Sequence, residues 1–384
     1  MKIAFDAKRA YQNATGLGHY SRTLISSLAT FYPTYYYYLC APRLTDRFDI
    51  SHFTHVKNVI PQDFFSKKLT SVWRSNWVKK DLQENGINIY HGLSNEIPVG
   101  IQKTAIRSVV TIHDLIFERY PEQYNWTDVQ IYRRKFKYAC KNANHIIAIS
   151  RQTKEDLINF YKIPQGKITI CYQSCNPAFA ETVSELEKNR IKQFYHLPER
   201  FFLYIGSITE RKNLLNICKA LNILKGKLNI PLVVIGDGGN YKKQVKEFIS
   251  KNNLKKQVVF LSETETAKTS RGYQSSADFP AICQLSAGVV YPSFFEGFGL
   301  PVLEALWSKV PVITSNISCL PETGGDAAYY VNPFSPGEIA EGMIKLATDE
   351  TLVSEMKHKG WLHAQNFTPQ KCAADIMEVY LRLL

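Results

Sequence analysis

The chain has 384 residues, 45% of them hydrophobic, and a formal net charge of +13 at pH 7. A chain of this length can bury more than one core, and we expect two domains of roughly 150 to 200 residues. The start, MKIAFDAKRA, lacks the apolar core of a secretory signal, and no later segment is long and apolar enough to cross a bilayer. The eight cysteines form no C-x-x-C pair. These features exclude a disulfide or zinc framework and predict a cytoplasmic protein with reduced thiols.

Apolar, β-branched segments recur along the chain, and each is followed by a loop and an amphipathic stretch. This is the pattern of βα units around a parallel sheet. The first half predicts strands at residues 2–6, 35–40, 87–91, 108–112, 145–149 and 167–171. The second half repeats the pattern at residues 201–205, 232–235, 258–261, 288–291 and 310–314.

We therefore expect an α/β fold in which two Rossmann-like domains face each other across a cleft. The first domain covers residues 1–180 and the second 199–368, with the polar segment 181–198 as a connector. The final segment, 369–384, begins at a Thr-Pro helix start and carries an apolar stripe. It predicts a helix that packs back on the first domain.

In an open parallel sheet, ligands bind beyond the carboxyl ends of the strands, and two motifs of the first half lie there. NATGLGHYSR places Gly16 and Gly18 just before a helical pattern. There the backbone can approach a ligand and helix N–H groups can meet an anion, although a plain loop would look the same. VVTIHDL places His113 at a strand end. This residue can donate a hydrogen bond to a substrate hydroxyl or phosphate, act as a base near neutral pH, or be purely structural.

The positive charge raises the question of an anionic partner. Two stretches, SKKLTSVWRSNWVKK at 66–80 and YRRKFKYACKNANH at 132–145, interleave bases with aromatic residues. On a helix such a stretch can form a face suited to anionic lipid headgroups. A solvated helix whose aromatic side chains pack into the core explains the same pattern equally well.

In the second half, FFLYIGSITERKNLL places Arg211 and Lys212 between a strand and a helix, where two cations and a helix dipole suit a pyrophosphate. LVVIGDGGN offers a glycine-rich turn after another strand, as a ligand loop or only a turn. PSFFEGFGLPVLEAL then sets Glu296 on a glycine turn and Glu304 about one turn into the following helix. Carboxylates bind vicinal hydroxyls and backbone N–H groups bind phosphate, so this arrangement suits a phosphorylated, polyhydroxylated ligand.

EGFGLPVLE, with its two glutamates, resembles the E-x7-E signature of the retaining, family 4 type glycosyltransferases with the GT-B fold. The resemblance covers essentially the whole chain, in the family's order, through TGLGHYSR, HGLSNEIP, TIHDL, IIAIS, GSITERKNL, IGDGG and SCLPETGGDAA. The TIHDL and EGFGLP neighbourhoods look most like bacterial mannosyltransferases of surface-polysaccharide assembly.

The resemblance implies that the second domain holds a nucleotide-diphosphate sugar. Lys212, helped by Arg211, would bind the diphosphate, and Glu304 the ribose hydroxyls. Glu296 would bind the donor sugar together with the turn backbone at Gly297, Phe298, Gly299 and Leu300. His113 and the loop of Gly16 and Gly18 would lie beside the sugar and the acceptor. Ser207 stands where many members have arginine, and Arg211 could supply the missing cation.

The implied reaction transfers a hexosyl group to a glycan or lipid-linked acceptor, with GDP-mannose as the leading donor and UDP-glucose or another nucleotide hexose as the alternative. Neither a metal nor another cofactor is expected, because the chain has no Asp-x-Asp motif and cations and helix dipoles can stabilise the leaving diphosphate. A nucleotide-sugar epimerase shares the architecture, but the E-x7-E stretch argues against it. A nucleic-acid-binding protein would explain the charge, but no RNA or DNA module is visible, so no nucleic-acid partner is expected.

Overall fold

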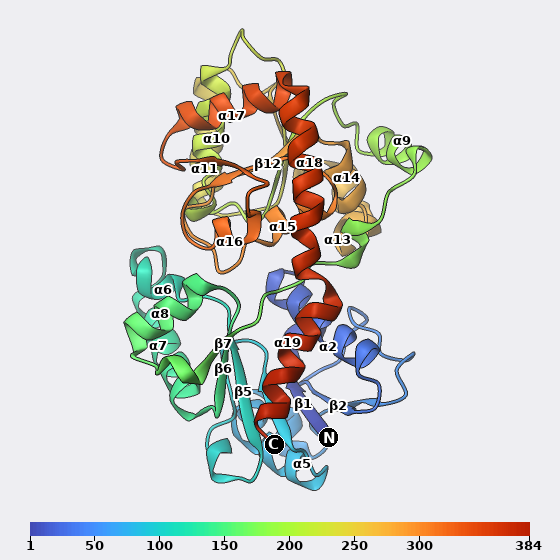
Figure 1. Cartoon of the computed structure of the whole chain (residues 1–384), viewed down its shortest axis with the longest axis vertical. Helices are drawn as coiled ribbons and strands as arrows, with labels where there is room; N and C mark the ends of the chain where they lie inside the picture. The colour runs from blue at the N-terminus through green and yellow to red at the C-terminus, as the bar shows by residue number, and fades with distance from the viewer. The chain divides into compact units, whose positions relative to one another are not determined.

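The computed structural model describes residues 1–384 and divides into two compact units, each built on one parallel sheet (Figure 1). Unit 1 consists of Met1–Cys175 together with Phe367–Leu384, and unit 2 of Asn176–Asn366. None of the helices combines the length and the apolar character that crossing a bilayer requires.

The sheet of unit 1 has seven parallel strands in the order β3-β2-β1-β4-β5-β6-β7. Their bounds are β1 Lys2–Asp6, β2 Tyr36–Cys40, β3 Val56–Val59, β4 Ile89–Gly92, β5 Arg107–Ile112, β6 His145–Ala148 and β7 Ile168–Ile170. The strand order reverses between β1 and β4, where Phe5 pairs with His91. Such a reversal opens a crevice at the carboxyl ends of the two strands.

Helices cover both faces of this sheet because side chains alternate between the faces along each strand. Phe5 and Leu39 pack with residues of α2 (Gly16–Phe31) and α19 (Pro369–Arg382). Ala4 and Tyr90 pack on the other face with α5 (Val78–Glu84), α7 (Trp126–Asn142) and α8 (Arg151–Tyr161). The remaining helices of this unit are short: α1 Lys8–Gln12, α3 Phe64–Lys68, α4 Thr70–Val72 and α6 Ile116–Arg119.

The last helix, α19, is part of the core of unit 1. Its Tyr380 is fully buried, and its hydroxyl lies 2.6 Å from Nδ1 of His91. Nε2 of His91 lies 2.8 Å from the hydroxyl of Thr111, which in turn lies 2.9 Å from the hydroxyl of Tyr20. This buried network joins α19, two strands and α2.

The sheet of unit 2 has six parallel strands in the order β10-β9-β8-β11-β12-β13. Their bounds are β8 Phe202–Ile205, β9 Leu232–Ile235, β10 Val258–Phe260, β11 Gly288–Tyr291, β12 Val312–Ser315 and β13 Tyr329–Val331. The longer helices are α9 Glu185–Phe194, α10 Leu214–Ile223, α11 Asn240–Lys251, α15 Leu300–Trp307, α17 Pro336–Thr348 and α18 Glu350–Ala364. The shorter ones are α12 Glu265–Thr269, α13 Arg271–Ser275, α14 Phe279–Leu285 and α16 Leu320–Gly324.

The α/β fold with two parallel sheets is confirmed, and each predicted strand overlaps an observed strand to within two residues at either end. The sequence prediction missed β3 and β13, which are both edge strands. β3 reads VKNV with an exposed centre, and β13 has only three residues, so neither shows an apolar run.

The predicted connector, 181–198, lies within unit 2 instead of between the units. Ile191 of α9 is fully buried, and the hydroxyl of Tyr195 donates to the carboxylate of Asp278 at 2.5 Å and lies 2.7 Å from the hydroxyl of Ser270. A few buried side chains thus anchor a segment whose overall composition is polar.

Candidate active site

The turn after β8 brings two cations to the carboxyl edge of the unit 2 sheet. Gly206 follows the strand and leads through a 3-10 turn, Glu210–Lys212, into α10. Gly206 has a φ of +147°, a conformation that residues with a Cβ rarely adopt, and a Cβ there would lie 2.9 Å from Nζ of Lys212. The Lys212 side chain therefore lies directly against the end of β8.

Asn213, which the sequence prediction did not include, fixes this turn to two others. Its φ is +65°, a left-handed conformation that asparagine tolerates, and its buried side-chain amide donates to the carbonyl oxygens of Pro292 at 2.9 Å and Pro333 at 2.7 Å. The N–H of Phe294 also donates to the carbonyl oxygen of Arg211 at 2.8 Å. The sequence signal for this role was the position of Asn213 directly before an apolar helical pattern, because asparagine is common in turns at the ends of helices.

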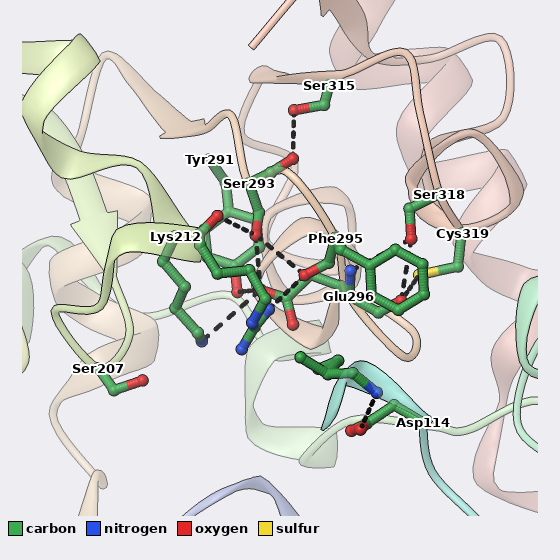
Figure 2. Close-up of polar contacts among 12 residues, drawn as sticks. Asp114, Ser207, Lys212, Tyr291, Ser293, Phe295, Glu296, Ser315, Ser318 and Cys319 are labelled. Carbon is green, nitrogen blue, oxygen red and sulfur yellow. Dashed lines mark hydrogen bonds and ion pairs between the residues drawn. The ribbon is translucent and has the colours of Figure 1, made fainter. Parts of the chain in front are cut away.

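Glu296 lies where these turns meet, with 9% of its surface exposed. Figure 2 shows Tyr291, Ser293 and Lys212 gathered around its carboxylate, with Ser207 apart from these contacts. The hydroxyls of Tyr291 and Ser293 donate to Oε1 at 2.7 and 2.9 Å. Nη1 of Arg211 lies 2.7 Å from the same oxygen, and Nζ of Lys212 lies 3.9 Å from it.

These contacts keep Glu296 ionised. Burial alone would raise the pKa of its carboxyl, but the charges of Arg211 and Lys212 and the hydrogen bond from Tyr291 outweigh burial and lower the pKa to about 2. The four contacts converge on Oε1. Oε2 is therefore the oxygen that can accept a hydrogen bond from a ligand hydroxyl.

The main chain of Glu296 is held as firmly as its side chain. The hydroxyl of Ser318 accepts from the Glu296 N–H at 3.2 Å and donates to its carbonyl oxygen at 3.0 Å. The thiol of Cys319 donates to the same carbonyl oxygen at 3.0 Å. These partners come from the segment just before α16, so hydrogen bonds from that segment hold the start of the glycine turn.

The predicted turn Gly297–Gly299 is buried and leads directly into α15. Gly299 is the N-cap residue with a φ of +97°, Pro301 stands in the first helical turn, and no side chain caps the helix start. The carbonyl oxygen of Phe298 accepts a hydrogen bond from the hydroxyl of Thr323. The helix thus begins at Leu300, as predicted, with its N-terminus at the same sheet edge as Glu296.

Glu304 is half-buried in α15. Burial raises the pKa of its carboxyl to about 7, while the charge of Lys212 acts in the opposite direction. The two glutamates therefore differ in protonation: near neutral pH Glu296 is ionised and Glu304 is partly protonated.

Lys212 is the cation shared by both carboxylates. Burial lowers the pKa of its ammonium group, the charges of Glu296 and Glu304 raise it, and the charge of Arg211 lowers it further. Its Nζ also lies 5.3 Å from the centre of the Tyr291 ring. A half-buried cation in such surroundings gains from an additional anion, as a bound diphosphate would provide.

The predicted site residues of the first domain lie in unit 1. His113 follows β5, is 5% exposed, and packs edge-on against the ring of Tyr20 with centres 4.7 Å apart. Its Nε2 lies 2.8 Å from the carbonyl oxygen of Leu93, to which it donates, and the amide of Gln173 lies 3.3 Å from Nδ1. Burial lowers the pKa of His113 to about 4, so the ring is uncharged at neutral pH and is only a weak base.

Gly16 and Gly18 stand at the beginning of α2. Gly16 is exposed, whereas the N–H of Gly18 donates to the side chain of Asn13 at 3.2 Å. Nη1 of Arg22 donates to the carbonyl oxygens of Ala10 and Asn13, both at 2.9 Å. Hydrogen bonds within unit 1 therefore hold the loop in place.

The two basic and aromatic stretches are divided between core and surface. Trp73 is 2% exposed and donates its Nε1 to Asp81 at 2.6 Å, so it packs into the core. Trp77 is 39% exposed. The most exposed aromatic side chains nearby, Phe64 and Phe65, precede the predicted stretch and are 64% and 69% exposed.

Two family models match the chain, one on each unit. A model described as Glycosyltransferase Family 4 matches residues 15–179, and one described as Glycosyl transferases group 1 matches residues 185–362. With the two parallel sheets and the cations and carboxylates at the edge of the second, these matches define the protein as a glycosyltransferase. The chain belongs to the group 1, family 4 type with the GT-B fold. The epimerase alternative is thereby set aside.

Curated relatives and solved structures agree with this assignment. O-antigen chain mannosyltransferase B of Escherichia coli is 24% identical over 99% of both chains. The serotype-specific mannosyltransferase WbdA of E. coli is 28% identical over 78% of this chain and 36% of its own length.

Solved structures with low identity share the fold along the whole chain. A glycosyltransferase from Rickettsia africae ESF-5 gives a TM-score of 0.75 at 16% identity and covers 100% of this chain and 98% of its own. Anabaena HepE in complex with UDP and glucose gives 0.73 at 15% identity, with 99% of both chains covered.

Proposed function

We propose that the protein transfers a mannosyl group from GDP-mannose to a hydroxyl of a glycan or lipid-linked acceptor, with retention of the anomeric configuration. The observation that carries the proposal is the arrangement in unit 2, where the charge of Lys212 acts on both an ionised Glu296 and a partly protonated Glu304 of α15. Cation, acceptors and helix N-terminus suit a diphosphate attached to hydroxyl-bearing groups. The names of the mannosyltransferase relatives support the choice of sugar.

In this proposal Lys212 binds the diphosphate and Arg211 assists by holding Glu296. Oε2 of Glu296 accepts a hydrogen bond from the donor sugar, and Glu304 accepts hydrogen bonds from the ribose hydroxyls. The backbone of Gly297–Leu300 contacts the sugar and its phosphate. In unit 1, the loop of Gly16 and Gly18 contacts the donor, and His113 contacts the substrate as a neutral group.

The proposed reaction breaks the bond between the anomeric carbon and the diphosphate oxygen, and the electron pair leaves with the diphosphate. The acceptor oxygen bonds to the same face of the anomeric carbon, and its proton passes to the leaving diphosphate. Negative charge grows on the diphosphate during this step, and Lys212 and the α15 N-terminus would stabilise it electrostatically. We propose that no divalent metal is required.

A UDP-hexose is the second candidate donor. Its support is that the fold neighbour HepE was solved with UDP and glucose. Contacts with the base and the sugar would decide between the two donors, whereas the proposed diphosphate contacts of Lys212 would serve both.

We also propose that unit 1 makes a peripheral contact with anionic membrane that holds the acceptor. Its support is the exposed Phe64 and Phe65, with Nζ of Lys68 4.5 Å from the centre of the Phe64 ring and Lys67 beside it in α3. Apolar rings flanked by lysines suit the interface of a membrane with anionic headgroups.

A nucleotide screen followed by a transfer assay tests the proposal. GDP should raise the melting temperature more than UDP, ADP or dTDP, because a ligand that binds only the folded state stabilises it. GDP-[¹³C]mannose and a mannose-ended glycan should then yield a product whose new linkage is α by NMR, like the donor. Turnover of a UDP-hexose alone would shift the assignment to the second donor, and a β linkage would contradict retention.

A further inference from the structure

A chain of ion pairs occupies the carboxyl edge of the unit 1 sheet at the reversal of strand order. Asp6, the last residue of β1, is 1% exposed and accepts from Nε of Arg74 at 3.0 Å with both oxygens. Nη1 of Arg74 lies 3.0 Å from Glu96, and Nζ of Lys135 lies 3.2 Å from the same carboxylate. Each carboxylate here already has a cation.

Lys8 and Arg9 follow Asp6 in α1 and are half-buried, but neither side chain forms an ion pair or a hydrogen bond. Burial lowers the pKa of the Lys8 ammonium, the positive charges of Arg74 and Arg9 lower it further, and Asp6 and Glu96 oppose these effects. Solvated surface cations would extend into water. Two adjacent half-buried cations without an ion-pair partner of their own can both pair with an anion that a ligand supplies.

Ser94 is a second, independent sign of a ligand at this edge. It is 5% exposed, and its hydroxyl has no hydrogen-bond partner. It lies two residues beyond β4, and β4 pairs with β1 so that the segment after Gly92 leaves the sheet next to the segment after Asp6. A buried hydroxyl without a partner is costly, and a ligand oxygen would satisfy it.

The site also lies near the predicted catalytic histidine. The positive charge of Arg9 acts on His113, and the carbonyl oxygen of Leu93, next to Ser94, accepts the hydrogen bond from the His113 ring. The cation pair is thus part of the surroundings of His113 within unit 1.

We propose that Lys8, Arg9 and Ser94 form an anion site that binds a phosphate or diphosphate group of the acceptor. This inference rests on the proposed function, in which the donor diphosphate is held by Lys212 in unit 2. It adds a substrate class: the acceptor is a phosphate ester, and unit 1 recognises that phosphate directly.

A titration with inorganic pyrophosphate tests the site in a protein that lacks the main phosphate cation of unit 2. The background variant is Lys212→Ala, and a triple variant adds Lys8→Gln and Arg9→Gln, which keep side-chain length and remove both charges. We expect Lys212→Ala to bind pyrophosphate at millimolar or lower concentration and the triple variant to bind at least tenfold more weakly. Ser94→Ala in the same background should lose severalfold.

The matched control replaces Lys255 and Lys256, two adjacent exposed lysines of unit 2, with glutamine. It removes the same net charge and should leave pyrophosphate binding within twofold of the background. Circular dichroism and melting temperature verify that every variant is folded. No pyrophosphate binding by Lys212→Ala, or equal binding by the triple variant and its background, overturns the proposal.

Two further comparisons separate the source of the phosphate. The variant with Lys8→Gln and Arg9→Gln alone should bind GDP within twofold of the wild type; a loss as large as that for pyrophosphate would assign the cations to the donor and overturn the proposal. Citronellyl diphosphate should bind more tightly than pyrophosphate if the acceptor is lipid-linked. It should bind equally if the site contacts only the phosphate, and both results support the site. A wild type that binds no nucleoside diphosphate would refute the proposed function but leave the pyrophosphate comparison intact.

Discussion

Arg211 and Glu296 form an ion pair in which Nη1 of the arginine lies 2.7 Å from Oε1 of the glutamate. The same guanidinium nitrogen donates to the carbonyl oxygen of Phe295, so Arg211 holds both the side chain and the backbone of the turn after β11. The sequence had suggested Arg211 as a replacement for the arginine missing at Ser207. These partners indicate that Arg211 positions Glu296, and we therefore propose Lys212 as the principal cation for a diphosphate.

Substitutions of the two glutamates should have different effects on kcat and on GDP affinity. Glu296→Gln should lower kcat on the order of a hundredfold or more and leave GDP affinity within about twofold, because free GDP has no sugar for Glu296 to contact. Glu304→Gln should instead weaken GDP through the loss of charged hydrogen bonds to the ribose. Calorimetric titration and initial rates on both variants measure this, with circular dichroism as the folding control. Identical behaviour of the two variants would contradict the division of roles.

Glu304 should make stability and nucleotide binding depend on pH near neutrality. Its folded pKa of about 7 exceeds the ordinary value of 4.5, so the folded protein binds the extra proton and loses stability as pH rises from 4.5 through 7. The free energy of unfolding of Glu304→Gln should therefore exceed that of the wild type by an amount that grows as pH is raised. The difference should reach up to about 3 kcal/mol at the high-pH limit and should appear as a higher melting temperature. GDP should bind the wild type about tenfold more weakly at pH 6 than at pH 8, since only the ionised carboxylate accepts from both hydroxyls.

The glutamine variant also provides the control for this pH experiment. Titration of the nucleotide phosphate affects both proteins alike, so only the difference between wild type and variant reports on Glu304. A difference that does not change between pH 5 and pH 8 would show that this carboxyl does not titrate there.

Gly206 should control nucleotide affinity through Lys212. Lys212→Ala should weaken GDP by roughly 1.5 to 3 kcal/mol, the worth of a charged hydrogen bond. Gly206→Ala places a Cβ 2.9 Å from Nζ of Lys212 and should cause part of the same loss by displacing the ammonium. Gly226→Ala is the matched control, because Gly226 also has a positive φ, +79°, but nothing lies within 4 Å of a Cβ there. Equal GDP affinity of the two alanine variants would disprove the steric link.

Turnover should not depend on a divalent metal. Lys212 and the N-terminus of α15 are expected to supply the stabilisation of the leaving diphosphate that a metal gives in other transferases. Initial rates in excess EDTA should stay within about twofold of untreated enzyme. Loss of activity in chelator that magnesium or manganese restores would rule out this mechanism.

Anionic liposomes should bind the protein through α3. The fraction that cosediments with phosphatidylglycerol vesicles should fall as salt rises and should fall further in the variant Phe64→Ser with Phe65→Ser. The variant Leu186→Ser with Leu362→Ser removes two apolar side chains of unit 2 that are 83% and 55% exposed, and it should bind like the wild type. Binding equal to that on neutral vesicles would favour a soluble acceptor.

The strand pattern of both sheets was readable from the sequence because central strands of a parallel sheet are continuous apolar runs. The edge strand β3 was not, since one side of it faces water and its centre carries Lys57 and Asn58. The prediction that segment 181–198 is a connector between the domains differs from the structure for a related reason. Ile191 and Tyr195 anchor the segment in unit 2, and two buried residues cannot be recognised within a polar composition.

At the candidate site, the residue types could be predicted but their partners could not. The E-x7-E spacing places Glu296 before α15 and Glu304 within it, and this local geometry follows from the chain itself. The lowered pKa of Glu296 depends on Arg211 and Lys212, which come from a distant turn and lie near it only because β8 and β11 are neighbours, whereas the raised pKa of Glu304 comes from burial. His113 illustrates the same limit, since its low pKa comes mainly from burial.

The position of α19 bears on the order in which the protein folds during synthesis. Unit 2 is one continuous stretch, so it can complete its core once Asn366 has left the ribosome. Unit 1 is synthesised first but needs Ala373, Ile376 and Tyr380 of α19 to close one face of its sheet. Beside α2, part of one apolar sheet face of unit 1 therefore lacks its α19 cover while the whole second domain is translated, and apolar surface exposed during synthesis favours aggregation.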